Sequence, residues 1–371
     1  MNKLIMSITL SAMILSSSVM LSACDEKNSF SIAGQKYSYD TTEVSVSDKT
    51  ITSFSELKDC ENLTTLSLDN CGITSLDEIG QLEGLKTLVL SNNSITDITP
   101  IKDLTHLQTL VLSNNNITDI SALEVLTHLT SLDIGKNPVE DISALSNLNK
   151  LKVLYADETN ISDISPLENA TRMEELYLSY NNIVGFSALT PLNDLRVLDL
   201  TESGITGLGV IAEASDLQEL YIGSNSEIED FSPLANFKSL RILYAENTSL
   251  SDLSPLAGLN KLNELILTND PISDISVLND KEYLMLLNIE GNYCLSKEAV
   301  GELQYTLPNC EIQHSELKTR LELDIESKKT ESEKPKNDSK STDTDVSDTE
   351  FDTEKSTDSD TDTRTNHMPQ Q

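Results

Sequence analysis

A pattern of leucines that repeats every 22 residues constrains the fold of this 371-residue chain more than any other feature. One copy occupies residues 107–128 and reads LQTLVLSNNNITDISALEVLTH. A fixed period in this range is typical of a solenoid, in which stacked units share one continuous core. An atypical first copy begins at Thr41, and the other copies begin at Leu63, Leu85, Leu129, Leu151, Met173, Leu195, Leu217, Leu240, Leu262 and Leu284.

Within each copy, the spacing of apolar residues predicts a short strand, a turn and a return segment. Apolar Leu110 and Leu112 alternate with other residues in 109–113, which predicts a strand with these leucines facing inward. Asn115 follows at the turn, where a buried amide can bond free backbone groups of its own and neighbouring coils. The return segment is too short for a full α-helix and favours 3₁₀ turns. Parallel strands stacked about 4.8 Å apart are expected to form one sheet on the concave face.

The return segments also carry a family resemblance. One reads Asp163-Ile164-Ser165-Pro166-Leu167, and another reads DLSPL at 252–256. The repeat thereby resembles the 22-residue leucine-rich repeat of the internalin family, over about two thirds of the chain. The resemblance implies an α/β solenoid: a leucine-rich-repeat horseshoe with a parallel concave sheet and a mostly 3₁₀ or irregular convex side. It identifies no partner, because this fold carries many functions.

The first 23 residues are typical of an export signal and not of the folded array. Lys3 precedes an apolar stretch, and Leu21-Ser22-Ala23-Cys24 resembles the lipobox of bacterial lipoproteins. That resemblance implies cleavage before Cys24 and a lipid on its sulfur; an ordinary secretory signal ending in Cys is the alternative. Two or three acyl chains hold a protein stably on a bilayer. We therefore expect an exported, membrane-anchored protein that faces the cell exterior, or the periplasm if the envelope has an outer membrane.

The composition divides the rest of the chain around the array. Residues 24–40 are expected to form a tether and N-terminal cap, and residues 41–292 a solenoid of about twelve units. Residues 293–314 predict a C-terminal cap with a helix that begins near Ser296, and residues 315–371 a disordered acidic tail rich in Ser, Thr and Asp. Two cysteines flank the predicted helix, so a disulfide is a candidate in an exported protein; they are Cys294 and Cys310.

Charge and motifs exclude several functional classes. With 61 acidic and 26 basic residues, the formal net charge is -35, which would repel nucleic acid. The chain carries no HExxH or GxSxG motif, so we expect neither an enzyme nor a cofactor. Recurring acids such as Asp119 could suggest a calcium ladder, but each follows the spacing of a turn-capping Asp, and we expect caps and no metal site.

The outward strand positions offer a candidate site. Four tyrosines share one frame position of the repeat, with Asp199 in the gap between the second and the third: Tyr155, Tyr177, Tyr221 and Tyr244. Stacked strands would bring them into a concave stripe, beside acidic residues at Asp133, Asp157, Glu175, Glu219 and Glu246. Tyrosine also simply suits an exposed strand. We favour a binding stripe because tyrosine anchors with charged neighbours are typical of interface hot spots.

These features predict a cell-surface lipoprotein that acts as a non-catalytic binding module. The expected partner is a protein or peptide with a basic or polar surface, recognised through the concave face. The alternative is a glycan-binding adhesin, in which the rings stack on sugars and the acids accept hydroxyl hydrogen bonds. A steep dependence of affinity on salt would favour protein, and a weak one glycan.

Overall fold

A computed structural model describes residues 28–323, 325 and 326 of the chain. The expected signal peptide at 1–23, the candidate lipidation site Cys24 and the acidic tail from residue 327 onward lie outside the described residues. Within those described ranges, none of the helices combines the length and the apolar character needed to cross a bilayer.

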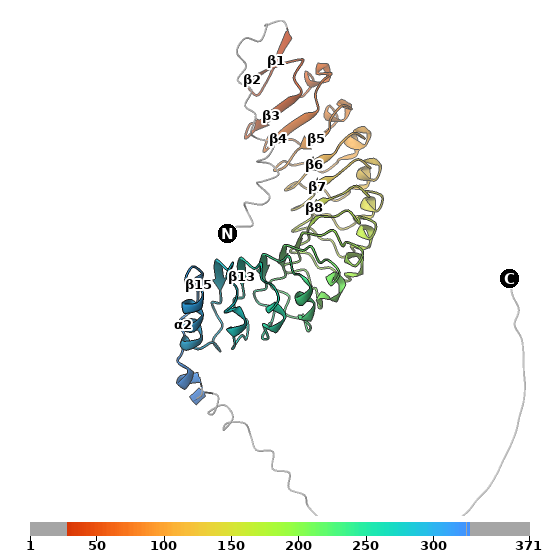
Figure 1. The fold of residues 1–371 in the computed structure, drawn as a ribbon. Helices are drawn as coiled ribbons and strands as arrows, with labels where there is room; N and C mark the ends of the chain where they lie inside the picture. Colours follow the sequence, from red (N-terminus) through yellow and green to blue (C-terminus); the bar gives the residue numbers. More distant parts are fainter. Residues whose placement is uncertain (1–27, 324, 327–371) are drawn as a thin grey trace, which may run out of the picture. The chain divides into compact units, whose positions relative to one another are not determined.

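A 13-stranded parallel sheet runs along the inner side of the curved solenoid (Figure 1). Each strand pairs with the next one in the chain, so that Leu110 lies beside Leu132 and equivalent frame positions become neighbours. This arrangement confirms the predicted leucine-rich-repeat horseshoe. The strands are β3 (Glu43–Ser47), β4 (Thr65–Asp69), β5 (Thr87–Val89), β6 (Thr109–Val111), β7 (Ser131–Asp133), β8 (Val153–Tyr155), β9 (Glu175–Tyr177), β10 (Val197–Asp199), β11 (Glu219–Tyr221), β12 (Ile242–Tyr244), β13 (Glu264–Ile266), β14 (Leu286–Asn288) and β15 (Glu311–Gln313).

The convex side consists of short 3₁₀ helices, which the aspartates of the return segments cap. The backbone N–H of Ser121 donates to Asp119 Oδ1 at 2.8 Å, and this bond lowers the pKa of the Asp119 carboxyl. The same bond recurs in other units, which confirms the predicted capping role. The 3₁₀ helices are η2 (Leu57–Asp59), η3 (Ile79–Gln81), η4 (Thr99–Asp103), η5 (Ser121–Val125), η6 (Ser143–Leu145), η7 (Ser165–Leu167), η8 (Ser187–Leu189), η9 (Leu208–Ile211), η10 (Ser232–Asn236), η11 (Ser254–Leu256) and η12 (Ser276–Leu278).

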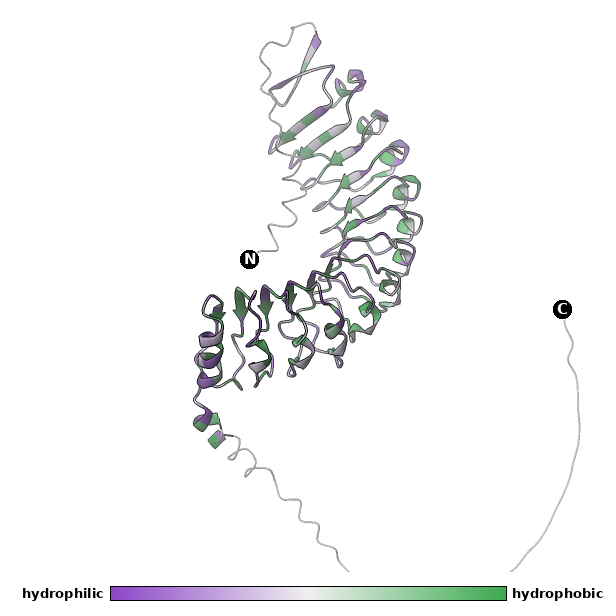
Figure 2. Ribbon diagram, viewed as in Figure 1, coloured by the Kyte–Doolittle hydropathy of each residue, from purple (hydrophilic) through white to green (hydrophobic). Residues whose placement is uncertain are grey.

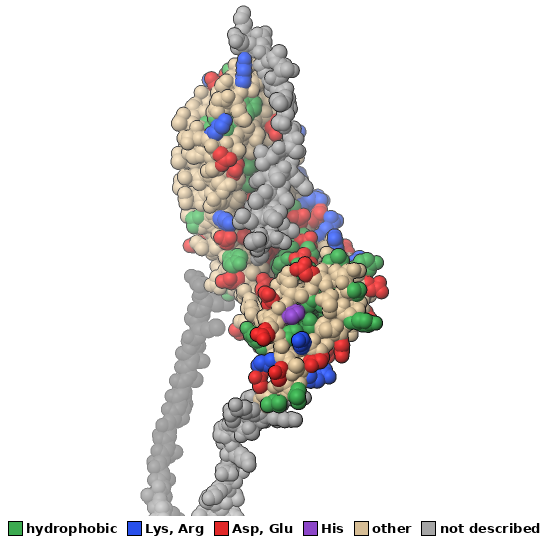
Figure 3. All heavy atoms as spheres, turned by 90° about the vertical axis from the view of Figure 1, so that its left-hand side faces the viewer, with side chains coloured by type: hydrophobic (Ala, Val, Ile, Leu, Met, Phe, Trp, Pro, Cys, Tyr) green, Lys and Arg blue, Asp and Glu red, His purple; other side chains and the backbone are tan. Residues whose placement is uncertain are grey.

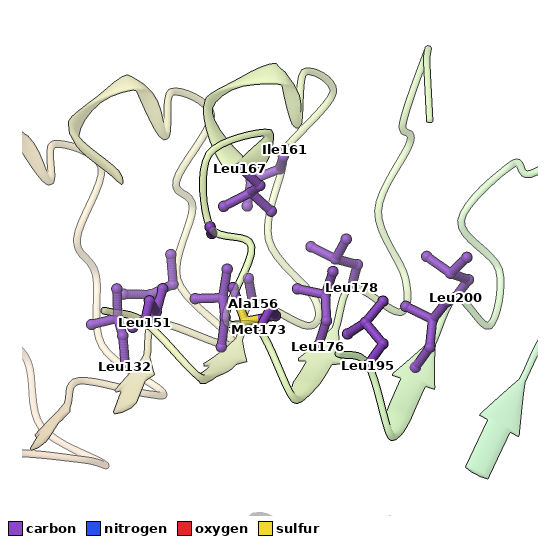
Figure 4. Packing of buried hydrophobic residues seen from close by; sticks show 14 of the residues in the cluster. Leu132, Leu151, Ala156, Ile161, Leu167, Met173, Leu176, Leu178, Leu195 and Leu200 are labelled. Atoms are coloured by element: carbon purple, nitrogen blue, oxygen red, sulfur yellow. The ribbon is translucent and has the colours of Figure 1, made fainter. Parts of the chain in front are cut away.

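The core lies between the sheet and the 3₁₀ helices and is continuous from unit to unit. Leu176 of β9 and Leu178 just after it belong to the same buried cluster as Leu167 of the return segment (Figure 4). In the hydropathy colouring, apolar residues recur at the same place in successive coils (Figure 2). Because each unit buries its leucines against the next one, the stacked units share one continuous core.

A ladder of buried amides joins the coils behind the strands, as the sequence predicts. Asn115 Oδ1 accepts the backbone N–H of Ile95 at 3.0 Å, and its Nδ2 donates to the carbonyls of Leu90 and Leu112 at 2.9 and 2.8 Å. One side chain thus satisfies backbone groups of two units that have no strand partner. Other residue types stand at this position in the other units, namely Lys49, Cys71, Thr159, Ser203, Thr248 and Asp270.

One core position breaks the apolar pattern. Lys281 occupies the frame position that holds Leu126 and Leu148 in earlier units, yet its side chain is fully buried. Its ammonium donates to the carbonyl of Ala257 at 2.6 Å, and burial lowers its pKa. The aliphatic stem of lysine can fill the space of a leucine while its end bonds the backbone.

Two caps close the array. At the N-terminal end, β1 (Ser29–Ile32) and β2 (Gln35–Ser38) form an antiparallel hairpin. At the other end, α2 (Lys297–Thr306) begins as predicted after Ser296, whose hydroxyl accepts the N–H of Ala299. The C-terminal cap reaches beyond residue 314, because Leu317 packs against the core.

The candidate disulfide of the C-terminal cap is not formed in the structure. Cys294 and Cys310 are both free thiols, the first exposed and the second buried. Cys310 is buried just before β15, whereas Cys294 lies on the surface before α2. Spacing along the chain alone suggested the pair, and it did not fix the side of the cap on which each sulfur lies.

Candidate binding site on the concave face

The outward positions of β7 to β13 form rows across the concave face, because every strand pairs in register. One row passes through Glu175, Val197 and Glu219, which are direct neighbours on three adjacent strands. A second row, two residues further along each strand, holds the tyrosines. We call the acids and tyrosines on these strands and just after them the concave acidic surface; it comprises Asp133, Tyr155, Asp157, Glu175, Tyr177, Asp199, Glu219, Tyr221, Tyr244, Glu246 and Glu264.

The four predicted tyrosines do come together, in two pairs. Tyr155 and Tyr177 stack with ring centroids 4.4 Å apart and an interplanar angle of 10°. Tyr221 and Tyr244 meet edge to face at 5.0 Å and 72°. Asp199 lies between the pairs in the register, as the sequence indicated.

The rings are more covered than an exposed stripe would be. The exposed fractions of Tyr155, Tyr177 and Tyr221 are 8%, 5% and 8%. Val197 and the partly buried Val153 and Ile242 pack with them into an apolar cluster separate from the main core. The tyrosines are therefore rigid parts of a packed surface, because their neighbours in the adjacent row are branched apolar residues.

Glutamates fix the phenolic hydroxyls. Tyr221 donates to Glu219 at 2.9 Å, and Tyr177 lies 3.4 Å from an oxygen of Glu175. Tyr244 donates to Glu264 of the next strand. Burial raises the pKa of the Tyr177 and Tyr221 hydroxyls, and the neighbouring carboxylates add to this effect, so both phenols stay protonated. Glu175, Glu219 and Glu264 thus each accept a hydrogen bond from a tyrosine hydroxyl, which orients their carboxylates on the surface.

Two aspartates of this surface are held at an energetic cost. Burial raises the pKa of Asp133 and of Asp157 to about 6. Asp133 accepts the N–H of Gly135 at 3.0 Å, and Asp157 accepts the hydroxyl of Ser179 at 2.6 Å. Carboxyls with raised pKa values are frequent at functional sites.

Glycine makes room for another acid of the surface. The carboxylate of Glu246 lies over Gly223, where a Cβ atom would come within 2.5 Å of Glu246 Cδ. Glu246 therefore lies against the backbone at this end of the surface, and an alanine at residue 223 would displace its carboxylate.

The charge of the concave acidic surface is one-sided. No Lys or Arg occupies the outward positions of β7 to β13 or the outward position just after each strand. These positions hold seven acids, namely Asp133, Asp157, Glu175, Asp199, Glu219, Glu246 and Glu264. Basic residues occur at the flank, where Lys152 and Arg196 pair with Glu174 at 2.6 and 3.2 Å. Acidic side chains gather on the C-terminal half of the solenoid in Figure 3. Such a surface attracts cationic groups.

Sequence reasoning missed two contributors to this surface. Glu264 occupies the same frame position as Glu175 and Glu219. Val197 occupies this position on the strand between those two glutamates. A row-by-row reading of the 22-residue frame would have found both. The frame alone does not predict the burial of the tyrosine rings, which depends on the rotamers of neighbouring side chains.

Comparison with known proteins identifies the repeat independently. The family model described as Leucine Rich repeats (2 copies) matches residues 61–103 and 105–147. A search of curated proteins gave no match. Among solved structures, an internalin (inlF) from Listeria monocytogenes is 30% identical, with a TM-score of 0.69 over 84% of this chain and 90% of that chain.

More distant structures share the fold alone. The functional domain of InlJ from Listeria monocytogenes is 19% identical, with a TM-score of 0.57 over 77% of this chain and 65% of that chain. The structure of PEPR1 with AtPEP1 is 20% identical, with a TM-score of 0.58 over 80% of this chain and 43% of that chain.

Proposed function

Because this chain belongs to the internalin-like leucine-rich-repeat proteins, we propose that it is a non-catalytic binding module whose concave acidic surface recognises a protein or peptide with a cationic surface. Leucine-rich-repeat proteins generally act as protein-binding modules through extended concave surfaces. The observation that carries the proposal is the set of seven acids without a lysine or arginine on the outward positions of β7 to β13.

The tyrosine pairs supply the second requirement of such a surface. Charges steer a partner toward the surface and select its orientation, whereas well-packed aromatic residues contribute most of the affinity. Here the rings are held by stacking and by hydrogen bonds to glutamates, so little rotamer freedom remains to be lost on binding.

Glycan binding is the second candidate. It would use the exposed edges of the rings and the carboxylates as acceptors for sugar hydroxyls. The packing of the rings against each other favours a protein partner, because a sugar stacks on an open ring face and Tyr155 and Tyr177 cover each other's faces.

Selection of ligands from a random peptide library, with the full chain as bait at low ionic strength, tests the proposal. We expect ligands rich in lysine and arginine, with an affinity that falls about tenfold or more between 50 and 500 mM NaCl. Tyr177→Ala and Tyr221→Ala should each weaken binding severalfold. Val111→Ala, at the same frame position in an earlier unit, is the control and should bind like the wild type. A glycan array with salt-independent hits and no selected peptide would support the glycan alternative.

We also propose that the chain is a lipoprotein held on the outer face of a membrane through Cys24. The proposal is supported by the sequence Leu21-Ser22-Ala23-Cys24 after an apolar stretch. Cys24→Ala should remove the acylated thiol, so the protein should leave the membrane fraction or stay as an unprocessed precursor, measured by detergent phase partitioning and mass. Unchanged partitioning would contradict lipidation.

A further inference from the structure

A second surface lies at the edge of the solenoid, where each strand ends. In every unit, the residue before the ladder position adopts a left-handed backbone. Its N–H donates to a carbonyl of the next unit, as from Asn114 to Gly135 at 2.9 Å, except in the last unit, where the N–H of Gly291 donates to the hydroxyl of Ser315. Asn and Gly tolerate this conformation best. The residues of this edge row are Asp48, Asn70, Asn92, Asn114, Lys136, Glu158, Tyr180, Glu202, Ser224, Asn247, Asn269 and Gly291.

Tyr180 is the one aromatic residue in this row. Its φ is 58°, a conformation that strains a bulky side chain, and 46% of its surface is exposed. Burial of the ring therefore compensates little of the strain. Asparagine tolerates this conformation better and stands at this position in other units, as Asn114 does. A tyrosine here therefore points to a role at the surface.

The surroundings of Tyr180 indicate what it could contact. Tyr180 and Glu202 line an open groove together with polar residues of three units, including Asn160, Ser162 and Asn182. Glu158 precedes Tyr180 in the edge row and Glu202 follows it, so carboxylates lie on both sides of the ring. Glu158 also pairs with Lys136 at 3.4 Å, an exposed ion pair that contributes little to stability.

An exposed apolar residue lies next to this groove, because the N–H of Val184 donates to the carbonyl of Ser162, a residue of the groove lining, at 2.9 Å. Val184, in the same unit as Tyr180, is 85% exposed. Its neighbour Gly185 occupies the frame position of the capping aspartates such as Asp163, so this unit lacks the usual cap. The unit therefore departs from the repeat at Tyr180, Val184 and Gly185, and the first two of these add apolar surface.

We propose that the groove beside Tyr180 binds a lysine or arginine side chain of the protein partner. The aliphatic stem of that side chain would lie near Val184. Its charged group would lie over the Tyr180 ring, within reach of the Glu202 carboxylate. Charge complementarity selects this occupant, because a purely apolar side chain would desolvate the flanking carboxylates without pairing them. The inference rests on the proposed function for the class of partner, but its surface is separate from the concave one.

Fluorine NMR of the full chain labelled with 3-fluorotyrosine tests the contact directly. The Tyr180 resonance is assigned as the one absent from Tyr180→Asn. Titration with N-acetyl-lysine methylamide or its arginine counterpart should shift this resonance, and the uncharged norleucine counterpart should not. Glu202→Gln should weaken the titration threefold or more. Equal shifts with norleucine, or no shift with either cation, would overturn the proposal.

Tyr180→Asn separates binding from folding. The substitution relieves the left-handed strain, so the melting temperature should rise by about 2 °C or more. Affinity for a fluorescein-labelled (Gly-Lys)₆ peptide, measured by anisotropy, should nevertheless fall threefold or more; unchanged affinity would overturn the role of Tyr180. Glu175→Lys with Glu219→Lys should leave the Tyr180 resonance shift intact, so a failure of the concave site can be told from a failure of the edge site.

Discussion

Asp270→Asn should raise the free energy of unfolding by about 2 kcal/mol at pH 8 and by almost nothing at pH 3.5. Asp270 is a buried carboxyl at the ladder position that asparagine holds in six of the twelve units. Its Oδ1 accepts the N–H of Thr248 at 2.8 Å, but its buried Oδ2 has no hydrogen-bond partner. An amide would place a donor at that atom and remove the buried charge.

The chain itself contains the arrangement that this substitution would create. In the units of Thr159 and Asn181, the carbonyl of Ala156 accepts both the hydroxyl of Thr159 at 3.1 Å and the amide of Asn181 at 2.8 Å. In the units of Thr248 and Asp270, the hydroxyl reaches the equivalent carbonyl, that of Ala245, at 2.7 Å, and no amide is available. The asparagine therefore fits without a change in the backbone.

The pH dependence follows from the pKa of Asp270, which burial raises from an ordinary value of 3.8 to about 6. The native state holds the proton up to about pH 6, whereas the unfolded chain releases it near 3.8. The penalty of the buried carboxylate is fully present above pH 6 and disappears below about pH 4. The advantage of asparagine should therefore grow across this window, measured by urea denaturation at each pH.

Asn181→Asp is the matched reverse change. It should lower the free energy of unfolding by about 2–3 kcal/mol at pH 8, because the amide now donates to the carbonyls of Ala156 and Leu178. If both variants shift the urea midpoint in the same direction, the ladder position does not distinguish amide from carboxyl and the account is wrong.

The fold could be predicted from sequence because its determinants are local and repeated. The period fixes which residues become neighbours, so Leu110 faces the core and Asn115 joins coils without any knowledge of distant contacts. The capping by Asp119 needs only the N–H two residues later. Each of these features is tested many times over within one chain, and that repetition is what makes the prediction secure.

The remaining features depend on side-chain reach and on backbone angles that no pattern states. Lys281 looks like a break in the core, yet its length lets it fill an apolar position and bond Ala257. The left-handed backbone of the edge row cannot be predicted from residue type, because only some of its members are Asn or Gly and others are residues such as Tyr180. The repeat frame predicts that the tyrosines lie on the concave face. Their burial depends on Val197 in the neighbouring row, which a single frame position does not include.

The largest effect on binding is expected from Glu175→Lys combined with Glu219→Lys. These residues flank Val197 on adjacent strands, so two cations would replace two anions at the centre of the concave acidic surface. Like charges placed opposite one another cost several kcal/mol at an interface, so the affinity for a selected lysine- and arginine-rich peptide should fall about 100-fold or more, measured by fluorescence anisotropy at 150 mM NaCl.

Two controls separate local from general electrostatics. Glu124→Lys with Glu213→Lys makes the same change in net charge on exposed convex residues and should weaken binding less than threefold, because screening limits charges beyond about 8 Å. Glu175→Gln with Glu219→Gln keeps an acceptor for the tyrosine hydroxyls and should give an intermediate loss. Equal losses in the two lysine variants would mean that the overall charge of the chain, and not the concave acidic surface, attracts the ligand.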